Sequence, residues 1–140
     1  QMCIRDRDVR LMVASGRSIT AGRETYNTFL ASPDLFDILE GTRLATDSEK
    51  TILTYLKETY SDITMWKSVF ELDGAGAGGT DRIYLFNRDA EHVQYTIPQV
   101  FEQLPPERQG MEYVTVCHSE SGGIKEYYPL AVLFADGAGA

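Results

Sequence analysis

A glycine-rich segment constrains this fold more than any other feature. It covers residues 72–82, LDGAGAGGTDR, and we call it the glycine segment. Glycine reaches turn conformations that other residues seldom adopt, so such a segment connects regular elements. Residues 63–72 before it show a period of two, which is typical of a strand. Residues 82–87 after it are apolar on both faces and predict an interior strand. The sequence therefore predicts a flexible hairpin loop between two strands.

The glycine segment also matches a known binding motif on paper. Gly74, Gly76 and Gly79 have the spacing of the dinucleotide fingerprint. That motif works because a helix N-terminus follows the glycines and receives the pyrophosphate, whereas a strand is expected here. Asp73 and Asp81 flank the segment and leave two alternatives, a calcium site or ordinary turn residues. Turn chemistry is the simpler account, so we predict no cofactor and no metal.

Size and charge narrow the class of protein. The chain has 140 residues, 43% of them hydrophobic, which is enough for one packed domain. Its net charge of −8 argues against a dedicated nucleic-acid reader, although a local basic patch would still allow weak contact with DNA. The longest apolar run, residues 130–135, is far shorter than the roughly 20 residues of a membrane helix. We therefore expect no membrane association.

The first seven residues, QMCIRDR, look foreign to the rest of the chain. They resemble translated sequencing-adapter text at the end of an assembled read, and residues 8–22 then read as the remnant of an upstream region. If Cys3 is set aside, Cys117 is the one cysteine left and cannot form an internal disulfide. We therefore expect a reducing compartment and a chain cut from a longer protein.

Two helices are predicted in the first half. Ser32 is a suitable N-cap, Pro33 suits the first helical position, and Gly41 ends the helix. A second helix is expected from Thr46 or Asp47, because Thr46 and Glu49 match a capping box. Its apolar residues recur at helical spacing: Ile52, Leu53, Leu56 and Tyr60.

Strands dominate the rest of the chain. They are predicted at residues 26–31, 92–97, 111–118 and 124–134, and residues 9–13 fit either a strand end or the tail of a helix. Pro105 and Pro106 predict a polar connector over residues 98–110, and Gly122-Gly123 predicts a turn. The eight tyrosines suit subunit contacts and ordinary sheet packing equally. The order of elements indicates an α+β fold with antiparallel strands.

One group of residues near the end of the chain matches a catalytic pattern. Cys117, His118 and Glu120 resemble a nucleophile, a base and an orienting carboxylate. Adjacent strand residues point to opposite faces, so Cys117 and His118 cannot pair directly. We expect a buried thiol beside a solvated ring, and no catalytic residues. His92 lies far away in the sequence, so a zinc site is not predicted.

An ordered set of short motifs resembles one family. The glycine segment is followed by Ile97-Pro98-Gln99, Leu104-Pro105-Pro106, Gly110-Met111-Glu112-Tyr113 and the closing residues 128–137. This set, with a strand and two helices upstream, is similar to tailed-phage major capsid proteins of the Hong Kong 97-type shell fold. The resemblance covers nearly everything after Arg23.

The resemblance implies the C-terminal part of a coat subunit. By that similarity, residues 23–96 form an axial-type domain, a sheet with two flanking helices, and residues 97–140 return to a peripheral domain. The N-terminal elements of the family have no counterpart here, which agrees with truncation. No catalytic residue is carried over, because the work of the family is to build a container.

The implied partners are other copies of the chain, in pentamers and hexamers, and packaged double-stranded DNA bound without sequence specificity. Scaffold or decoration proteins are further candidates. The implied location is the virion capsid, assembled in the bacterial host cytoplasm. Two alternatives stay open: an encapsulin-like nanocompartment shell, and a small α+β ligand-binding or hydrolytic domain that uses Cys117 and His118.

Overall fold

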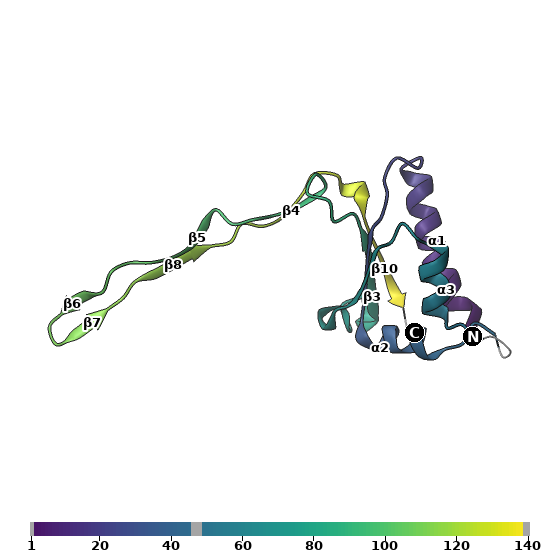
Figure 1. Ribbon diagram of the computed structural model, residues 1–140, viewed down its shortest axis with the longest axis horizontal. Helices are drawn as coiled ribbons and strands as arrows, with labels where there is room; N and C mark the ends of the chain where they lie inside the picture. Colours follow the sequence, from purple (N-terminus) through teal and green to yellow (C-terminus); the bar gives the residue numbers. More distant parts are fainter. Residues whose placement is uncertain (1, 46–48, 139–140) are drawn as a thin grey trace. The chain divides into compact units, whose positions relative to one another are not determined.

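A computed structural model describes residues 2–45 and 49–138. The chain forms two compact units. The first consists of Gln1–Asp89 and Tyr128–Ala140, and the second of Ala90–Tyr127, which we call the ribbon. Figure 1 shows helices only in the first unit, and paired strands along the ribbon. The boundaries between the two units therefore lie at residues 89/90 and 127/128, whereas the sequence predicts one domain boundary, at 96/97.

The first unit is built on a four-stranded sheet. Its strands are β1 (Thr28–Ala31), β2 (Met65–Ser68), β3 (Asp81–Phe86) and β10 (Val132–Ala138), in the order β10-β3-β1-β2. Strands β1 and β2 are parallel, whereas β3 is antiparallel to both β1 and β10. The interior position predicted for residues 82–87 is confirmed, because β3 has a partner on each side.

The predicted hairpin loop is wrong. Because β1 lies between β2 and β3, the glycine segment completes a crossover and does not join adjacent strands. The strand expected over residues 63–72 ends at Ser68, and the chain continues through two short 3-10 turns, Phe70–Leu72 and Ala77–Gly79. The long return path that the parallel pairing of β1 and β2 requires is residues 32–64, which contain two helices, whereas the glycine segment passes from β2 to β3 on the far side of β1.

Three helices accompany the sheet. Helix α2 (Pro33–Gly41) has the predicted cap, since the backbone N–H of Leu35 donates to Oγ of Ser32 at 3.3 Å. Helix α1 (Met2–Ile19) resolves the ambiguity at residues 9–13 in favour of a helix, and it also contains residues from the foreign-looking start. Its buried residues Val9, Val13 and Gly16 follow helical spacing.

Helix α3 begins later than predicted. It covers Ile52–Thr59 and is capped by Thr51, whose hydroxyl accepts from the N–H of Thr54 at 3.3 Å. The expected start at Thr46 or Asp47 lies outside the described residues, and Glu49 precedes the helix. The capping-box pattern was therefore misleading, and a second threonine performs that role.

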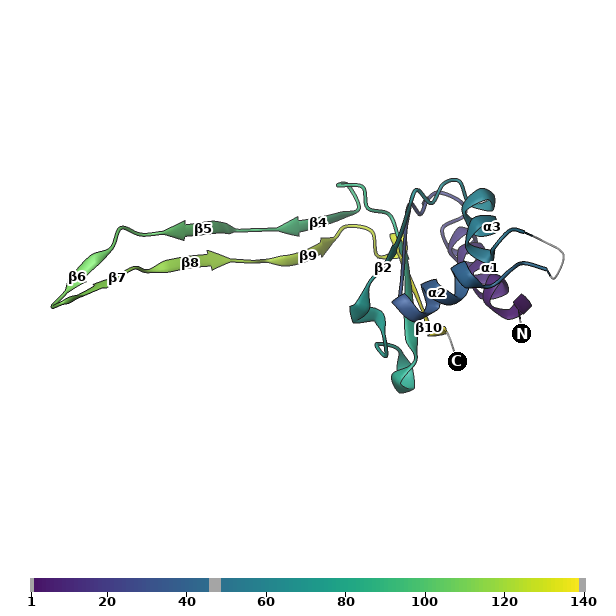
Figure 2. The ribbon, with the colours of Figure 1, turned by 60° about the horizontal axis from the view of Figure 1, so that its bottom comes forward.

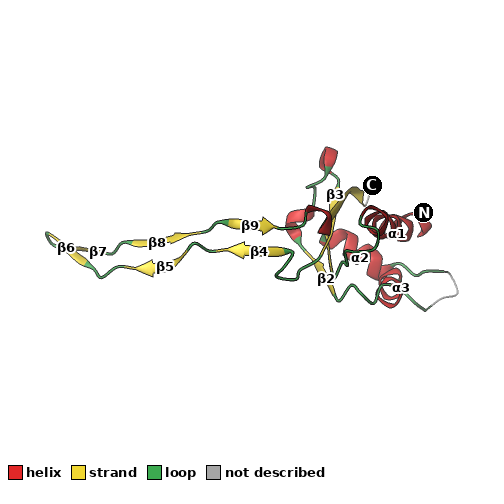
Figure 3. Cartoon of the chain, turned by 90° about the horizontal axis from the view of Figure 1, so that it is seen from above, coloured by secondary structure: helices red, strands yellow, loops and turns green. Residues whose placement is uncertain are grey.

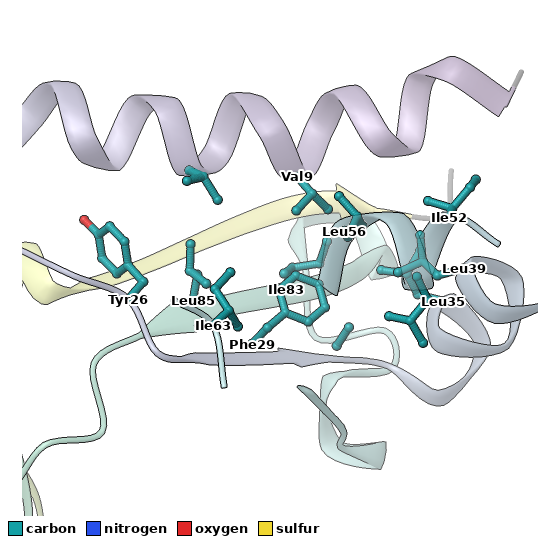
Figure 4. Packing of buried hydrophobic residues seen from close by; sticks show 13 residues of the cluster. Val9, Tyr26, Phe29, Leu35, Leu39, Ile52, Leu56, Ile63, Ile83 and Leu85 are labelled. Carbon is teal, nitrogen blue, oxygen red and sulfur yellow. The ribbon is translucent and has the colours of Figure 1, made fainter. Parts of the chain in front are cut away.

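The core lies between the sheet and the helices. Figure 4 shows Phe29, Ile83 and Leu85 between the strands and helix α1. The buried cluster draws on all three helices: Val9, Val13, Tyr26, Phe29, Ala31, Leu35, Leu39, Ile52, Leu53, Leu56, Ile63, Ile83 and Leu85. Gly16 permits a close approach, because a Cβ there would lie 2.4 Å from Cδ1 of Leu133. Helix α1 therefore packs directly on β10.

The ribbon contains two long runs of chain in antiparallel pairing. Strand β4 (Val93–Thr96) pairs with β9 (Gly123–Glu126), β5 (Gln99–Gln103) with β8 (Cys117–Glu120), and β6 (Glu107–Gln109) with β7 (Glu112–Val114). Figures 2 and 3 show these pairs following one another along the ribbon. The chain reverses at Gly110, where φ is 66°.

Several sequence predictions fail over residues 98–134, and the single strand expected over residues 111–118 is divided into β7 and β8. The polar connector expected over residues 98–110 contains β5 and β6, because the prolines fall between the strands and not inside them. Gly122-Gly123 does not reverse the chain but interrupts one side of the ribbon. The single closing strand expected over residues 124–134 is divided into β9, a 3-10 turn at Pro129–Ala131, and β10.

Candidate functional site: an exposed apolar surface on the ribbon

The ribbon exposes most of its large apolar side chains. None of its 38 positions is buried. The exposed residues include Tyr95, Ile97, Val100, Phe101, Leu104, Met111, Tyr113, Val114, Val116, Ile124 and Tyr127. We call this set the apolar ribbon surface. Monomeric proteins seldom expose apolar patches beyond a few hundred Å², and larger patches mark interaction sites.

The backbone of the ribbon is also incompletely paired. Among the described residues each ribbon strand has one neighbour, so its other edge presents N–H and C=O groups without a ladder partner there. An isolated two-stranded hairpin is at best marginally stable in water, because it has no third strand or helix to cover it. Both observations indicate a surface made to be covered.

Cross-strand pairing sorts the side chains of each segment into two faces. Near the base, Val93 and Tyr95 share a face with Glu126 and Ile124, and Lys125 lies on the other face. Near the tip, Glu107 pairs with Val114 and Gln109 with Glu112. The opposite face there carries the pair of Arg108 and Tyr113. Acidic and basic groups are thus separated locally, which gives the surface a charge pattern as well as apolar contacts.

Cys117, His118 and Glu120, the residues that resemble a catalytic group, lie where β5 pairs with β8. Cys117 pairs with Gln103 and His118 with Glu102, so thiol and imidazole lie on opposite faces. Nε2 of His118 is 3.6 Å from a carboxylate oxygen of Glu102 and contacts the side-chain amide of Gln99. Cys117 is exposed, so the prediction of a buried thiol is wrong. A nucleophile needs its base within hydrogen-bond reach, and this arrangement does not provide one.

The glycine segment is a second place with concentrated polar contacts. Oδ2 of Asp81 accepts from the hydroxyl of Ser32 at 2.5 Å, and Oδ1 accepts from the N–H of Gly74 at 3.2 Å. The hydroxyl of Ser32 and then this N–H hold the pKa of the Asp81 carboxyl below its ordinary value, because they favour its charged form. Asp81 therefore fastens the segment to the start of helix α2.

Asp136 fastens the other side of the segment. Its carboxylate receives Nε of Arg82 at 2.6 Å and Nη2 at 3.0 Å, a bidentate pair between β3 and β10. It also accepts from the N–H of Ala77 at 3.3 Å. The guanidinium of Arg82 lowers the pKa of Asp136, and the carboxylate in turn raises the pKa of Arg82. The flexible loop expected from the glycines is thus held by Asp81, which the sequence analysis names, and by Asp136, whose role it does not predict.

The residues that the sequence suggests as ligands either form contacts within the protein or lie apart from one another. Both carboxylate oxygens of Asp81 accept bonds from the protein, which suits turn chemistry more than a calcium site with Asp73. Within residues 2–45 and 49–138, no group of three His, Cys, Asp or Glu side chains is placed to hold a metal ion. Strand β3 follows the glycines, so the helix that the dinucleotide motif requires is missing from that position.

The residues that sequence reasoning missed are mostly apolar. Val100, Phe101 and Leu104 lie in the stretch that two prolines marked as a polar connector. Their apolar character was a visible signal, and a strand on each side of Pro105-Pro106 would have satisfied both observations. In the part of the chain that the structure covers, no helix is long and apolar enough to cross a membrane.

Comparison with known proteins supplies an independent view. A family model described as "Major capsid protein" matches residues 2–138. The capsid of Myoviridae phage XM1 has a TM-score of 0.80 at 16% identity, over 94% of this chain and 45% of that one. A virus-like particle from Pyrococcus furiosus gives 0.61 at 15% identity, over 93% and 49%. No curated protein sequence matches significantly. The chain thus spans about half the length of the solved structures to which it is similar.

Proposed function

Because this chain belongs to the major capsid protein family, we propose that it is a structural virion protein that self-assembles into the icosahedral shell of a tailed phage. The observation that carries the proposal, beside the family itself, is the apolar ribbon surface, which the described residues leave uncovered. A stable interface buries about 1,600 Å² in total, and exposed apolar side chains of this kind form the centre of such interfaces.

The other partners follow from the same proposal. Copies of the chain form pentamers and hexamers, the shell encloses double-stranded DNA without reading its sequence, and scaffold or decoration proteins bind during assembly. The net charge of −8 suits weak and non-specific contact with DNA at most. The protein acts without catalysis, and it assembles in the bacterial host cytoplasm before it resides in the virion.

The division of labour within the subunit is part of the proposal. The first unit, with its packed core, is the axial-type region, and the ribbon belongs to the peripheral region. Strand β10 extends the sheet of the first unit, so residues 128–138 join the axial-type region in this refined assignment. A boundary at 96/97 would separate strand β4 from strand β9, with which it pairs.

A second candidate is a nanocompartment shell that encloses protein cargo. The similarity to the virus-like particle from Pyrococcus furiosus supports it. The higher TM-score with the phage capsid favours the virion. Neighbouring genes separate the two candidates, because portal and terminase genes accompany a phage capsid and cargo genes accompany a nanocompartment.

Electron microscopy of the expressed protein tests the proposal. We expect closed shells, or rings of five and six subunits, whose formation depends on protein concentration. Subunits that stay monomeric at high concentration, with the ribbon folded and uncovered, would contradict it.

A further inference from the structure

The pairing of β5 with β8 contains a register shift. Gln99 pairs with Glu120 and Glu102 pairs with His118, so three steps along β5 oppose two steps along β8. Residues opposite each other share a face of the ladder, and so do residues two apart on one strand. In a regular strand Gln99 and Glu102 would lie on opposite faces. The extra residue in β5 brings both of them to the face of His118.

His118 contacts both of these residues through one ring nitrogen. Its Nε2 contacts the side-chain amide nitrogen of Gln99 and lies 3.6 Å from a carboxylate oxygen of Glu102. The two contacts need different states of the ring. An amide N–H donates to Nε2 only when that nitrogen carries no proton, whereas a carboxylate accepts only when it does. Protonation therefore releases the contact with the amide and adds a charged hydrogen bond to Glu102.

The charged groups around this ring are all acidic. The titratable residues of β5 and β8, apart from His118, are Glu102, Glu120 and Cys117. The two carboxylates lie on the face of His118, one on each strand, and Cys117 lies on the opposite face with Gln103. The side chains of His118 and Glu102 are 42% and 60% exposed, so protons reach the ring freely and water screens part of the attraction.

We propose that His118 is a proton-dependent lock on the shifted register of β5 and β8. Histidine side chains ordinarily change charge between about pH 5 and 8, where carboxylates stay ionised. At the acidic end of this range the charged ring binds Glu102 and holds the two strands together. As the pH rises the ion pair is lost, only the contact with Gln99 is left, and the pairing opens more often.

A single side-chain contact has weight here because the ribbon itself specifies its register weakly. No position of β5 or β8 is buried, and strands without a buried face are prone to slippage. The inference goes beyond the proposed function and does not depend on it, since it concerns pairing within one ribbon.

Hydrogen exchange of the full chain tests the lock at about pH 5.5 and about pH 7.5, the two ends of the histidine range. The protein is kept below the concentration at which light scattering detects assembly. The probes are peptides of β5 and β8 and the N–H of Leu104, which donates to the carbonyl oxygen of Val116 at 2.9 Å. After correction for intrinsic rates, we expect exchange about two- to fivefold slower at the lower pH, as a partly exposed ion pair supports. Strands β6 and β7 contain no histidine and should show no such difference.

Three variants separate the lock from other effects of pH. Glu102→Gln keeps the size of the side chain but removes its charge, so the difference between the two pH values should disappear. Glu112→Gln makes the same change on β7 of the same ribbon and should keep the difference. His118→Lys is positive at both pH values and should show the slower exchange at both. Unchanged fluorescence of Trp66 checks that the first unit of each variant is folded.

Equal corrected exchange of the parent at the two pH values would overturn the lock. A pH difference that persists in Glu102→Gln would overturn it as well, because the proposed partner would then play no part. Closed shells in electron microscopy together with either of these results would leave the proposed function standing and refute the lock alone.

Discussion

The two units of this chain use apolar residues in opposite ways. In the first unit, Phe29 and Leu85 are almost completely buried between a sheet and three helices. In the ribbon, Phe101 and Tyr113 are 63% and 70% exposed. A buried side chain stabilises the subunit itself, whereas an exposed one contributes only when a partner covers it. Folding and assembly are therefore assigned to different parts of one sequence.

Two phenylalanines give the sharpest test of that contrast. Phe29→Ala should lower the free energy of unfolding by about 3–5 kcal/mol, because it removes a fully buried ring and leaves a cavity. Phe101→Ala makes the same chemical change on the ribbon and should stay within about 0.5 kcal/mol. Urea denaturation followed by tryptophan fluorescence measures both, since Trp66 lies 4.8 Å from the ring of Phe29. Similar losses at the two positions would abolish the distinction between the units.

The sequence predicts the first unit better than the ribbon, and the reason is physical. Ser32 and Pro33 act through local backbone geometry, so the start of helix α2 could be placed correctly. The position of β1 between β2 and β3 depends on contacts across the whole unit, which local patterns do not encode. The glycine segment was therefore assigned to a hairpin although its turn residues were identified correctly.

The ribbon was harder to predict for a different reason. Pro105 and Pro106 predict a connector over residues 98–110, but they fall between two short strands that lie within that stretch. A strand with neither face buried lacks the clear alternation on which strand prediction relies. The apolar ribbon surface became visible only when the pairing showed that none of the described residues covers it.

A smaller loss of stability is expected at the cap of helix α2. Ser32→Ala removes the acceptor for the N–H of Leu35 and the donor to Asp81, at a buried position. The cost should be about 1–2 kcal/mol, within the range measured for caps. Thr51→Ala is the matched control at helix α3, where the cap is exposed and the cost should be about 0.5–1 kcal/mol. Equal costs in thermal melts would show that the bond to Asp81 adds nothing.

Acid should loosen the glycine segment before it affects the rest of the first unit. The folded-state pKa values of Asp81 and Asp136 lie below the ordinary value of 3.8. Their stabilisation is therefore complete above that pH and is lost as the pH falls through the lowered values. Hydrogen exchange at the N–H groups of Gly74 and Ala77, which donate to these carboxylates, should speed up in that range, after correction for intrinsic rates.

Asp136→Asn should reproduce part of this effect at neutral pH. The variant keeps the shape of the side chain but removes the charge that pairs with Arg82, so exchange at Ala77 should rise severalfold. Glu71→Gln removes a charge from an exposed residue near the same segment and should leave that exchange unchanged. Unchanged exchange in Asp136→Asn would show that the glycine segment holds its shape without this carboxylate.

The smallest effect on stability is expected at Val100. This position therefore best separates a role in folding from a role in assembly. Val100 is 74% exposed beside the register shift of β5, so Val100→Ser should leave the melting of the first unit unchanged. The same variant should raise the protein concentration at which assembly begins, because it removes apolar area from the surface that we propose a partner covers. Leu11→Ser makes a similar change on helix α1, where the side chain is 55% exposed, and should assemble like the parent. Light scattering against protein concentration measures the threshold. An unchanged threshold for Val100→Ser, together with a raised threshold for Leu11→Ser, would show that copies assemble through helix α1 of the first unit and not through the ribbon.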